Sequence, residues 1–387
     1  MPRHGAARDG DTLAVTGTHT SPDIRMPVED IARMSQTLSA AVCLVLMLLA
    51  LIACSPQTET HGEQFTLLGT HAEVTVSNAP EEKALAAIGE TVAVLRAFDS
   101  VGYTFGKGTE LRRLNAALAQ GEPFTASPEL VELIRISRKL SRQSGGLFNP
   151  AAGELTALWE YHCLSEPCPE SPYPDEVMKL VEMKDKSVLE QNPAMEDIVI
   201  DGNVVRSDNT SVKLEFGDVI RGFAMDKGIE RLEALGIGDA MIDVGPSVRA
   251  MGSKGEHPWW VGLHDAAGEH ILGIIELPED ESVVTVKAFA TSAAVEGTIH
   301  RHVVNPMTGM PVKGIASATV VHDSAAVASV AAASLLVAGI DNWKTVADRM
   351  GVRALLLFAD DGSLYISSAL SPMIHWRTEV SHELLRH

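Results

Sequence analysis

Apolar side chains recur at regular intervals along most of the chain, and their spacing predicts helices and strands. Residues 81–98 place Leu85, Ile88, Val92, Leu95 and Phe98 at three- and four-residue intervals, which is the period of an amphipathic helix. A second helix begins at Ser127-Pro128-Glu129, which supplies an N-cap, a first-turn proline and an acid. Gly145-Gly146 ends this helix, because glycine accepts the left-handed backbone that follows many helices.

The remaining pattern predicts strands between these and further helices. Residues 65–76 alternate as one strand containing Gly69, and residues 212–216 and 240–244 are strands that flank a helix over 221–235, a β-α-β unit ended by Gly236. Residues 325–338 are apolar nearly all round and predict a buried helix. Residues 353–358 and 363–367 predict a hairpin across Asp360-Asp361-Gly362. The proline-rich residues 160–176 predict an ordered loop or insertion. We expect an α+β fold, a single compact domain built on a mixed sheet.

An uncharged apolar run covers residues 38–53 and ends at Cys54. It is short for a transmembrane helix, which needs about 20 residues, and suits the core of a signal peptide. Leu51-Ile52-Ala53-Cys54 resembles a bacterial lipobox, in which the cysteine is acylated and becomes the mature N-terminus. We expect residues 1–53 to be an N-terminal extension with a signal peptide and residues 54–64 to be a lipid-anchored tether. The alternative is a short membrane anchor in which Cys54 is incidental.

These expectations place the mature protein in the cell envelope, on the exported, periplasmic side of a membrane. The oxidising surroundings there favour a disulfide between Cys163 and Cys168, which are separated by four residues. A metal site at this pair is disfavoured, because no other cysteine would remain to complete it.

Composition and charge narrow the partners. The 387 residues include 45% hydrophobic residues, enough for a sizeable core in one large or two smaller domains. The formal net charge of -20 excludes nucleic acid as an expected partner, since phosphates require a basic face. The chain has neither a G-x-S-x-G elbow nor a phosphate-binding G-x-x-x-x-G-K-[ST] loop.

Seven segments resemble the ApbE family, the FAD:protein FMN transferases, in order and approximate spacing. They are LGT at 68–70, FGKGTELRRLN at 105–115, GLFNPAAGELTALW at 146–159, GDVIRGFAMD at 217–226, DVG at 243–245, ATS at 290–292 and HVVNPMTGMP at 302–311. The resemblance implies one flavin-transferase domain over residues 65–370, followed by a C-terminal tail over 371–387.

The resemblance implies a phosphoryl-transfer enzyme. FAD is the substrate, FMN is moved to a Ser or Thr of an exported redox protein, and AMP leaves, with Mg²⁺ neutralising the pyrophosphate. Two alternatives remain open. In the first alternative, the chain is a flavin-binding lipoprotein that has lost transfer chemistry. In the second, it is an FAD pyrophosphatase that uses water as the nucleophile on the same scaffold.

The resemblance also implies positions that contact FAD: Leu68, Phe105, Leu147, Phe148, Asn149, Glu215, Arg221, His302 and Val303. Arg221 lies at an expected helix start, where backbone N–H groups favour anions; the alternative is a solvated arginine. Phe105 would stack on a flavin or adenine ring or belong to an ordinary core. Glu215 would bond flavin or ribose groups or be a surface acid. No residue is assigned a catalytic role.

The metal-ligand positions depart from the family pattern. The family's D-A-L-A-T becomes SVAAA, so that Ser329 replaces the carboxylate and Ala333 replaces the hydroxyl. Mg²⁺ requires oxygen ligands, usually including a carboxylate. Asp218 either compensates or is an unrelated surface acid. Because Asn149, Pro246 and Asn305 also depart, the pattern predicts weak Mg²⁺ dependence and transfer that is slow or absent.

Overall fold

The structure is a computed structural model. It describes residues 59–102, 108–164, 186–266, 268, 270–277, 280–288 and 303–386, with the backbone alone at 159–164 and Asp218. The chain divides into two units, 1–57 and 58–387, and the described residues belong to the second. The predictions for Cys54, Phe105, Cys168 and His302 lie outside the described residues, as does the side chain of Cys163.

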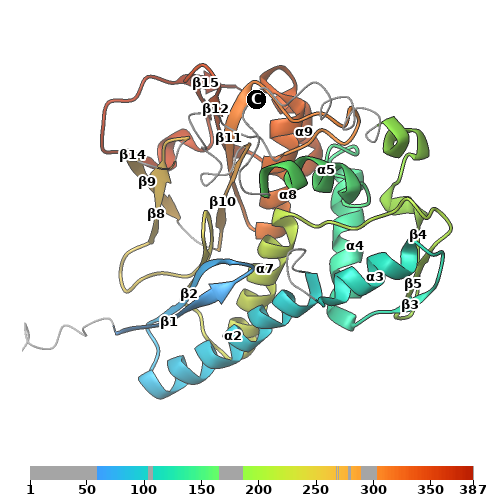
Figure 1. The fold of residues 1–387 in the computed structure, drawn as a ribbon. Coiled ribbons are helices and arrows are strands. Elements are labelled where there is room, and N and C mark those ends of the chain that lie inside the picture. The colour runs from blue at the N-terminus through green and yellow to red at the C-terminus, as the bar shows by residue number, and fades with distance from the viewer. Residues whose placement is uncertain are drawn as a thin grey trace, which may run out of the picture. The chain divides into compact units, whose positions relative to one another are not determined.

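A nine-stranded sheet is the centre of the described unit (Figure 1). Its neighbouring strands are antiparallel, except that β15 runs parallel to β13. In spatial order the strands are β1 (Thr60–Leu67), β2 (Thr70–Ser77), β6 (Ala240–Val244), β7 (Ser247–Met251), β10 (Ser282–Lys287), β11 (Ile315–His322), β12 (Ala354–Ala359), β13 (Leu364–Ser367) and β15 (Glu383–Leu385).

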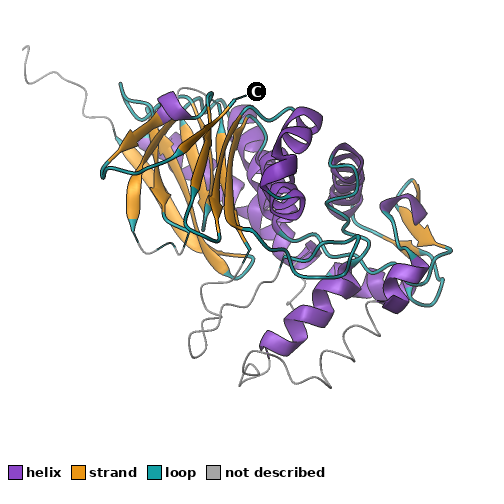
Figure 2. Cartoon of the chain, turned by 90° about the horizontal axis from the view of Figure 1, so that it is seen from above, coloured by secondary structure: helices purple, strands orange, loops and turns teal. Residues whose placement is uncertain are grey.

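Helices cover one face of this sheet, as Figure 2 shows. They are α2 (Glu81–Gly102), α7 (Asp218–Ala234) and α8 (Ala325–Ala338), with α7 packed against both others. The main core lies between the two layers, where strand residues such as Ile242 and Val320 join helix residues such as Leu95 and Leu335. Burial of these apolar surfaces is the main force that holds the layers together.

A second, three-stranded sheet covers the other face. It consists of β14 (Ile374–Trp376), β9 (Ile271–Leu277) and β8 (Trp259–His264). A smaller core forms where Trp259 and Ile275 of this sheet meet Val283 and Leu356 of the large one. Residues of the expected C-terminal tail thus contribute β14 and β15 to the two sheets, with η4 (Ser371–Met373) just before them.

The other described elements lie beside the helical layer. They are α3 (Glu110–Leu118), α4 (Pro128–Gln143), α5 (Gly153–Leu164), α9 (Trp343–Met350), the short helices η1 (Met195–Asp197) and η3 (Ile340–Asn342), and a sheet of β3 (Phe124–Thr125), β5 (Val204–Ser207) and β4 (Ile198–Asp201). In the described part of the chain no single helix is long and apolar enough to cross a bilayer; only α8 taken together with Ile340–Met350, bent by 120°, meets that criterion.

The predicted strand over 65–76 is wrong, because the segment is a hairpin. Leu67 ends β1, Thr70 begins β2, and the turn between them has positive φ at Leu68 (49°) and Gly69 (75°). Two left-handed residues give the turn that suits the twist of a hairpin. A left-handed backbone at a leucine costs about 1–2 kcal/mol. The turn is therefore unusual for the residue type, and the alternating pattern alone did not reveal it.

The predicted strand over 212–216 is also wrong. This segment forms one bridge, between Lys213 and Ala152, and its other backbone groups bond to a side chain and a loop instead of a strand. Leu214 exchanges two hydrogen bonds with the Asn115 side chain, and the Glu215 N–H donates to the Pro150 carbonyl. Since β6 pairs antiparallel with β2 and β7, the β-α-β interpretation fails as well.

The other predicted helices and strands are confirmed. Helices α2, α4 and α8 and strands β6, β12 and β13 lie where the pattern placed them, and the Ser127 hydroxyl caps α4 by accepting from Leu130 N–H. Helix α7 begins three residues before the predicted start. Helix α5 continues to Leu164, so the predicted loop over 160–176 is wrong at its first residues, and its part from 165 lies outside the described residues. The α+β class with a mixed sheet is confirmed.

Candidate functional site

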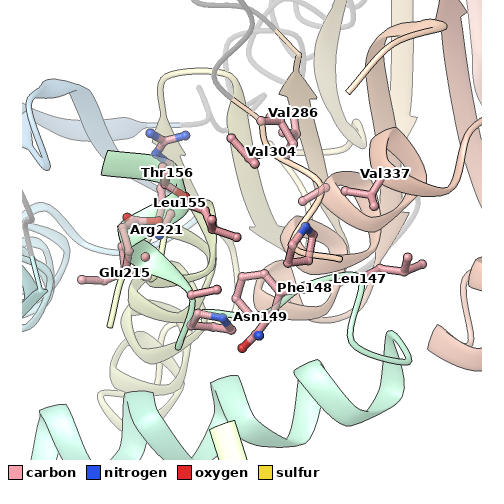
Figure 3. A pocket seen from close by; sticks show the side chains of 18 of the residues that line it. Leu147, Phe148, Asn149, Leu155, Thr156, Glu215, Arg221, Val286, Val304 and Val337 are labelled. Carbon is pink, nitrogen blue, oxygen red and sulfur yellow. Dashed lines mark hydrogen bonds between the residues drawn. The ribbon is translucent and has the colours of Figure 1, made fainter. Parts of the chain in front are cut away.

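A cavity of about 270 Å³ lies where α5, α7 and α8 meet several turn and loop segments. Figure 3 shows Glu215 and Arg221 on one side of it and Leu147 and Val337 on the other. The lining is mainly apolar, and Asn149, Thr156, Glu215 and Arg221 supply side-chain polar groups among the described lining residues. Such a mixture of apolar walls and few polar groups is typical of a small-molecule site.

The cavity gathers most of the residues that the sequence singled out. Those that line it are Leu68, Leu147, Phe148, Asn149, Glu215, Arg221, Val303 and Ala333. They come from the β1–β2 turn, the segment before α5, the segment before α7, α7 itself, the loop after residue 302 and α8. Phe105 and His302 lie outside the described residues, so their predicted roles stay predictions.

The N-terminus of α7 forms the polar side of the cavity. Gly217 is the N-cap with a φ of 54°, and its N–H donates to the Glu215 carboxylate over 2.8 Å. Gly217, Ile220 and Arg221 all line the cavity. The guanidinium is always charged, and the positive end of the helix dipole lies beside it. Arg221 and the helix N-terminus therefore favour an anionic group on this side, whereas the Glu215 carboxylate, which accepts from Gly217 N–H, opposes it.

The segment before α5 forms the apolar side, and its shape is fixed by two side chains. The Ser144 hydroxyl accepts from Phe148 N–H over 3.1 Å. The Asn149 amide donates to the Pro193 carbonyl over 2.8 Å, and its oxygen accepts from Ala151 N–H over 3.2 Å. An ionised aspartate at position 149 could not donate the bond to the Pro193 carbonyl. The asparagine that departs from the family pattern therefore has a structural reason.

Two positioning residues escaped the sequence reasoning. Asp99 accepts from Leu68 N–H over 2.6 Å and so holds the strained β1–β2 turn against the cavity. Asn115 holds the segment that carries Glu215, with both of its bonds to Leu214 at 2.8 Å. Asn115 ends the FGKGTELRRLN segment, which was a usable signal, whereas nothing in the local sequence marks Asp99.

The predicted metal positions do not form a metal site of described residues. Ser329 is 1% exposed and does not line the cavity, and its hydroxyl donates to the Ala325 carbonyl over 2.8 Å. Ala333 lines the cavity with a methyl group. Helix α7 covers Ser329, since a Cβ at Gly222 would lie 2.6 Å from the Ser329 Oγ.

The described residues at positions 329 and 333 do not supply the Mg²⁺ ligands that the resemblance implies. Among the described residues, no group of three His, Cys, Asp or Glu side chains is placed to hold a metal. The structure does not describe the Asp218 side chain, so its predicted compensating role stays a prediction. We therefore derive no step of the chemistry through a metal.

An acidic residue with a raised pKa lies in the large sheet. Asp243 of β6 is the register partner of Glu73 in β2, and His71 lies nearby. Burial raises the pKa of Asp243 to about 6, the negative charge of Glu73 acts in the same direction, and His71 opposes the shift. Asp243 does not line the cavity, so we assign it no role in ligand binding.

Comparison with known proteins gives one consistent result. The model of the ApbE family matches residues 68–356. An FAD:protein FMN transferase of Rhodobacter capsulatus is 34% identical over 304 residues, which cover 79% of this chain and 56% of that relative. An FAD:protein FMN transferase of Vibrio cholerae is 25% identical over 277 residues, covering 70% of this chain and 79% of that protein. The chain thus spans little more than half the length of the Rhodobacter relative.

Solved structures show the same fold. The flavin transferase ApbE from Vibrio cholerae superimposes with a TM-score of 0.66 at 22% identity, over 82% of this chain and 99% of that one. The ApbE protein of Thermotoga maritima superimposes with a TM-score of 0.69 at 20% identity, over 82% of this chain and all of that one.

Proposed function

The chain belongs to the ApbE family, and from this premise we propose that it is an FAD:protein FMN transferase. In this proposal FAD occupies the cavity, and a Ser or Thr hydroxyl of an exported protein attacks the phosphorus of the FMN half. The bond from that phosphorus to the AMP phosphate breaks, AMP leaves, and the hydroxyl proton is released. The product carries FMN through a phosphodiester bond.

One observation carries the proposal: the cavity joins a polar side, where Arg221, the N-terminus of α7 and Glu215 lie, to an apolar side (Figure 3). Arg221 and the N-terminus of α7 offset the charge of the pyrophosphate and the charge that develops as AMP leaves. Leu147, Phe148 and Val303 supply apolar surface for a flat ring. Positioning and charge stabilisation are what phosphoryl transfer requires from a protein.

Magnesium has a reduced role in this proposal. The family resemblance implies Mg²⁺, but Ser329 bonds within its own helix and Ala333 has no ligand atom. We expect weak Mg²⁺ dependence and slow transfer.

The alternative is an FAD-binding lipoprotein that has lost transfer chemistry, and the positions of Ser329 and Ala333 favour it. Both functions share the same cavity and the same contacts to FAD, and they differ only in whether the bound FAD is then cleaved. An FAD pyrophosphatase is distinguished by its products.

The site of action in the cell is part of the proposal. The apolar run over 38–53 and the Leu51-Ile52-Ala53-Cys54 sequence support a protein anchored by lipid at Cys54, on the exported side of a membrane. The FMN acceptor is accordingly an exported redox protein.

The experiment is to incubate the detergent-purified protein with FAD, with or without Mg²⁺, and a flavin-free exported redox protein as acceptor. The acceptor and the nucleotides are then analysed by mass spectrometry. We expect the acceptor to gain the mass of FMN less one water and AMP to appear in equal amount. Free FMN with AMP and an unlabelled acceptor would indicate the pyrophosphatase. Bound, unchanged FAD would contradict the proposal and support the binding protein.

A further inference from the structure

A side chain of α7 caps the N-terminus of α8. Asp226 accepts hydrogen bonds from Ala325 N–H over 2.8 Å, from Ala326 N–H over 3.0 Å and from the Ser324 hydroxyl over 2.8 Å. These bonds satisfy two of the N–H groups that every helix leaves open at its start. Ser324, the N-cap of α8, accepts from Val327 N–H and satisfies a third.

The cap is largely buried and has a counter-charge. The Asp226 side chain is 17% exposed, and the Nε of the 10% exposed Arg249 lies 3.6 Å from its Oδ1. Arg249 belongs to β7 and also donates to the carbonyl of Ala250. One carboxylate therefore connects α7, α8 and the large sheet. A charged cap in such surroundings costs free energy to remove, because buried N–H groups lose their partner.

A second contact lies one helical turn earlier on α7. Gly222 is four residues before Asp226 and so lies on the same side of the helix. A Cβ there would collide with the Ala325 carbonyl and the Ser329 hydroxyl, so the backbones of α7 and α8 touch at this glycine. The cap and the glycine together fix both the distance and the register between the two helices.

The register of α8 determines one wall of the cavity. Ser329, Ala333 and Val337 follow one another at four-residue intervals and therefore share a side of α8. Ser329 lies against Gly222, and Ala333 and Val337 line the cavity together with Ile220 and Arg221 of α7. A shift of α8 along or away from α7 would move this wall without changing any residue that touches the ligand.

We propose that Asp226 is a positioning residue for FAD: by capping α8 it sets the separation of α7 and α8, two helices that line the cavity. The inference rests on the proposed function in so far as FAD is the ligand. It assigns Asp226 no contact with FAD. It also leaves the anion site to α7 and Arg221, because the first N–H groups of α8 already bond to Asp226 and Ser324.

Two substitutions separate positioning from simple capping. Asp226→Asn keeps the volume but loses the charge and one acceptor, and we expect FAD affinity to fall roughly 10-fold. Asp226→Glu keeps a charged acceptor but adds one methylene between the helices. We expect this variant to recover most of the midpoint temperature of unfolding that Asp226→Asn loses, while its FAD affinity stays low. FAD affinity is measured by calorimetry and the midpoint temperature by circular dichroism.

Ser324→Ala is the matched control: it removes one bond to the same carboxylate and the bond from Val327 N–H, but leaves both backbone bonds to Asp226 in place. We expect its FAD affinity to equal that of the unmodified protein. The inference is overturned if Asp226→Glu recovers affinity and stability together, if Asp226→Asn leaves affinity unchanged, or if Ser324→Ala lowers affinity as much as Asp226→Asn. An unmodified protein that binds no FAD overturns the proposed function itself. If Asp226→Asn fails to fold, the comparison of Asp226→Glu with Ser324→Ala decides.

Discussion

Asp243 is a carboxyl group whose position in the fold opposes its ionisation. It is largely buried, and its direct cross-strand partner is the carboxylate of Glu73. Like charges directly opposite each other in a sheet are unfavourable. The protonated form is therefore favoured in the folded state, where the pKa of Asp243 is about 6 against an ordinary value of 3.8.

This shift predicts how stability depends on pH. The stability linked to Asp243 is fully present below pH 4 and is lost as the pH rises through about 6. Asp243→Asn removes the ionisable group, so we expect it to raise the free energy of unfolding at pH 8 by about 1–2 kcal/mol after solvent screening. At pH 4 the two proteins should agree more closely. Urea unfolding at pH 4, 6 and 8 measures the difference; a gain that is equal at all three would contradict the assignment.

Single residues also explain where sequence reasoning about the site succeeded and failed. Arg221 and Phe148 were identified because their segments resemble the ApbE family, and the fold brings both to the cavity. Asn149 was counted as a departure that weakens function, although its amide donates a bond that its loop needs. Asp99 could not be found, since its role depends on a turn more than thirty residues away in the sequence.

At the scale of elements, the residues of α8 bear on whether the protein binds a metal ion. In this helix the residue at the family's carboxylate position is covered by α7, and the residue at the hydroxyl position is an alanine on the cavity wall. A carboxylate introduced at Ser329 would be buried between two helices. Without a partner it would be costly, and with a bound cation the cost would fall.

We therefore expect the double variant Ser329→Asp, Ala333→Thr to be less stable than the native protein without divalent cations. Mg²⁺ should raise its midpoint temperature and increase AMP release from FAD. Ser329→Asn, Ala333→Val is the control, because it fills similar space without the charge and should respond to neither. A double variant that is indifferent to Mg²⁺ in both measurements would show that this helix is no longer near a metal position. Rapid Mg²⁺-dependent transfer by the native protein would contradict our interpretation that Ser329 weakens the metal site.

Elements with strong local signals were predictable and those defined by distant partners were not. Helix α4 has its cap, its proline and its glycines within its own sequence, and α8 is apolar enough to be buried in any arrangement. The segment 212–216 has the composition of a strand, but its backbone groups bond to Asn115 and to the loop at Pro150 in place of a neighbouring strand. The β1–β2 hairpin depends on a leucine in a left-handed conformation, which the residue type disfavours.

At the scale of the whole molecule, the layered fold assembles the cavity from segments that are far apart in sequence. The β1–β2 turn, the first turns of α5 and α7, the strand β10 and the C-terminal half of α8 all meet there. The order of strands in the large sheet, which places β2 beside β6 and β11 beside β12, could not be deduced from the sequence pattern. The resemblance of short segments was the evidence that anticipated this assembly.

The proposed place of the protein in the cell makes a separate prediction. If Cys54 is acylated, its lipid chains give stable membrane attachment, with about 0.8 kcal/mol per buried CH₂ group. We expect Cys54→Ser to appear in the soluble fraction or as an unprocessed precursor, whereas Cys43→Ser should behave like the native protein. Fractionation and lipid labelling measure this. Unchanged labelling and processing in Cys54→Ser would exclude the lipid anchor at this residue.

The central claim is that FAD binds in the cavity with its pyrophosphate against Arg221, and calorimetric titration of FAD tests it most directly. A charge-assisted contact is worth about 1.5–3 kcal/mol, so Arg221→Ala should weaken FAD binding roughly 10- to 100-fold. Arg221→Lys, which keeps the positive charge, should recover part of the affinity. Arg231→Ala, on the same helix but paired with Glu90 and absent from the cavity lining, should have no effect. An unmodified protein that fails to bind FAD, or an Arg221→Ala variant with unchanged affinity, would contradict the claim.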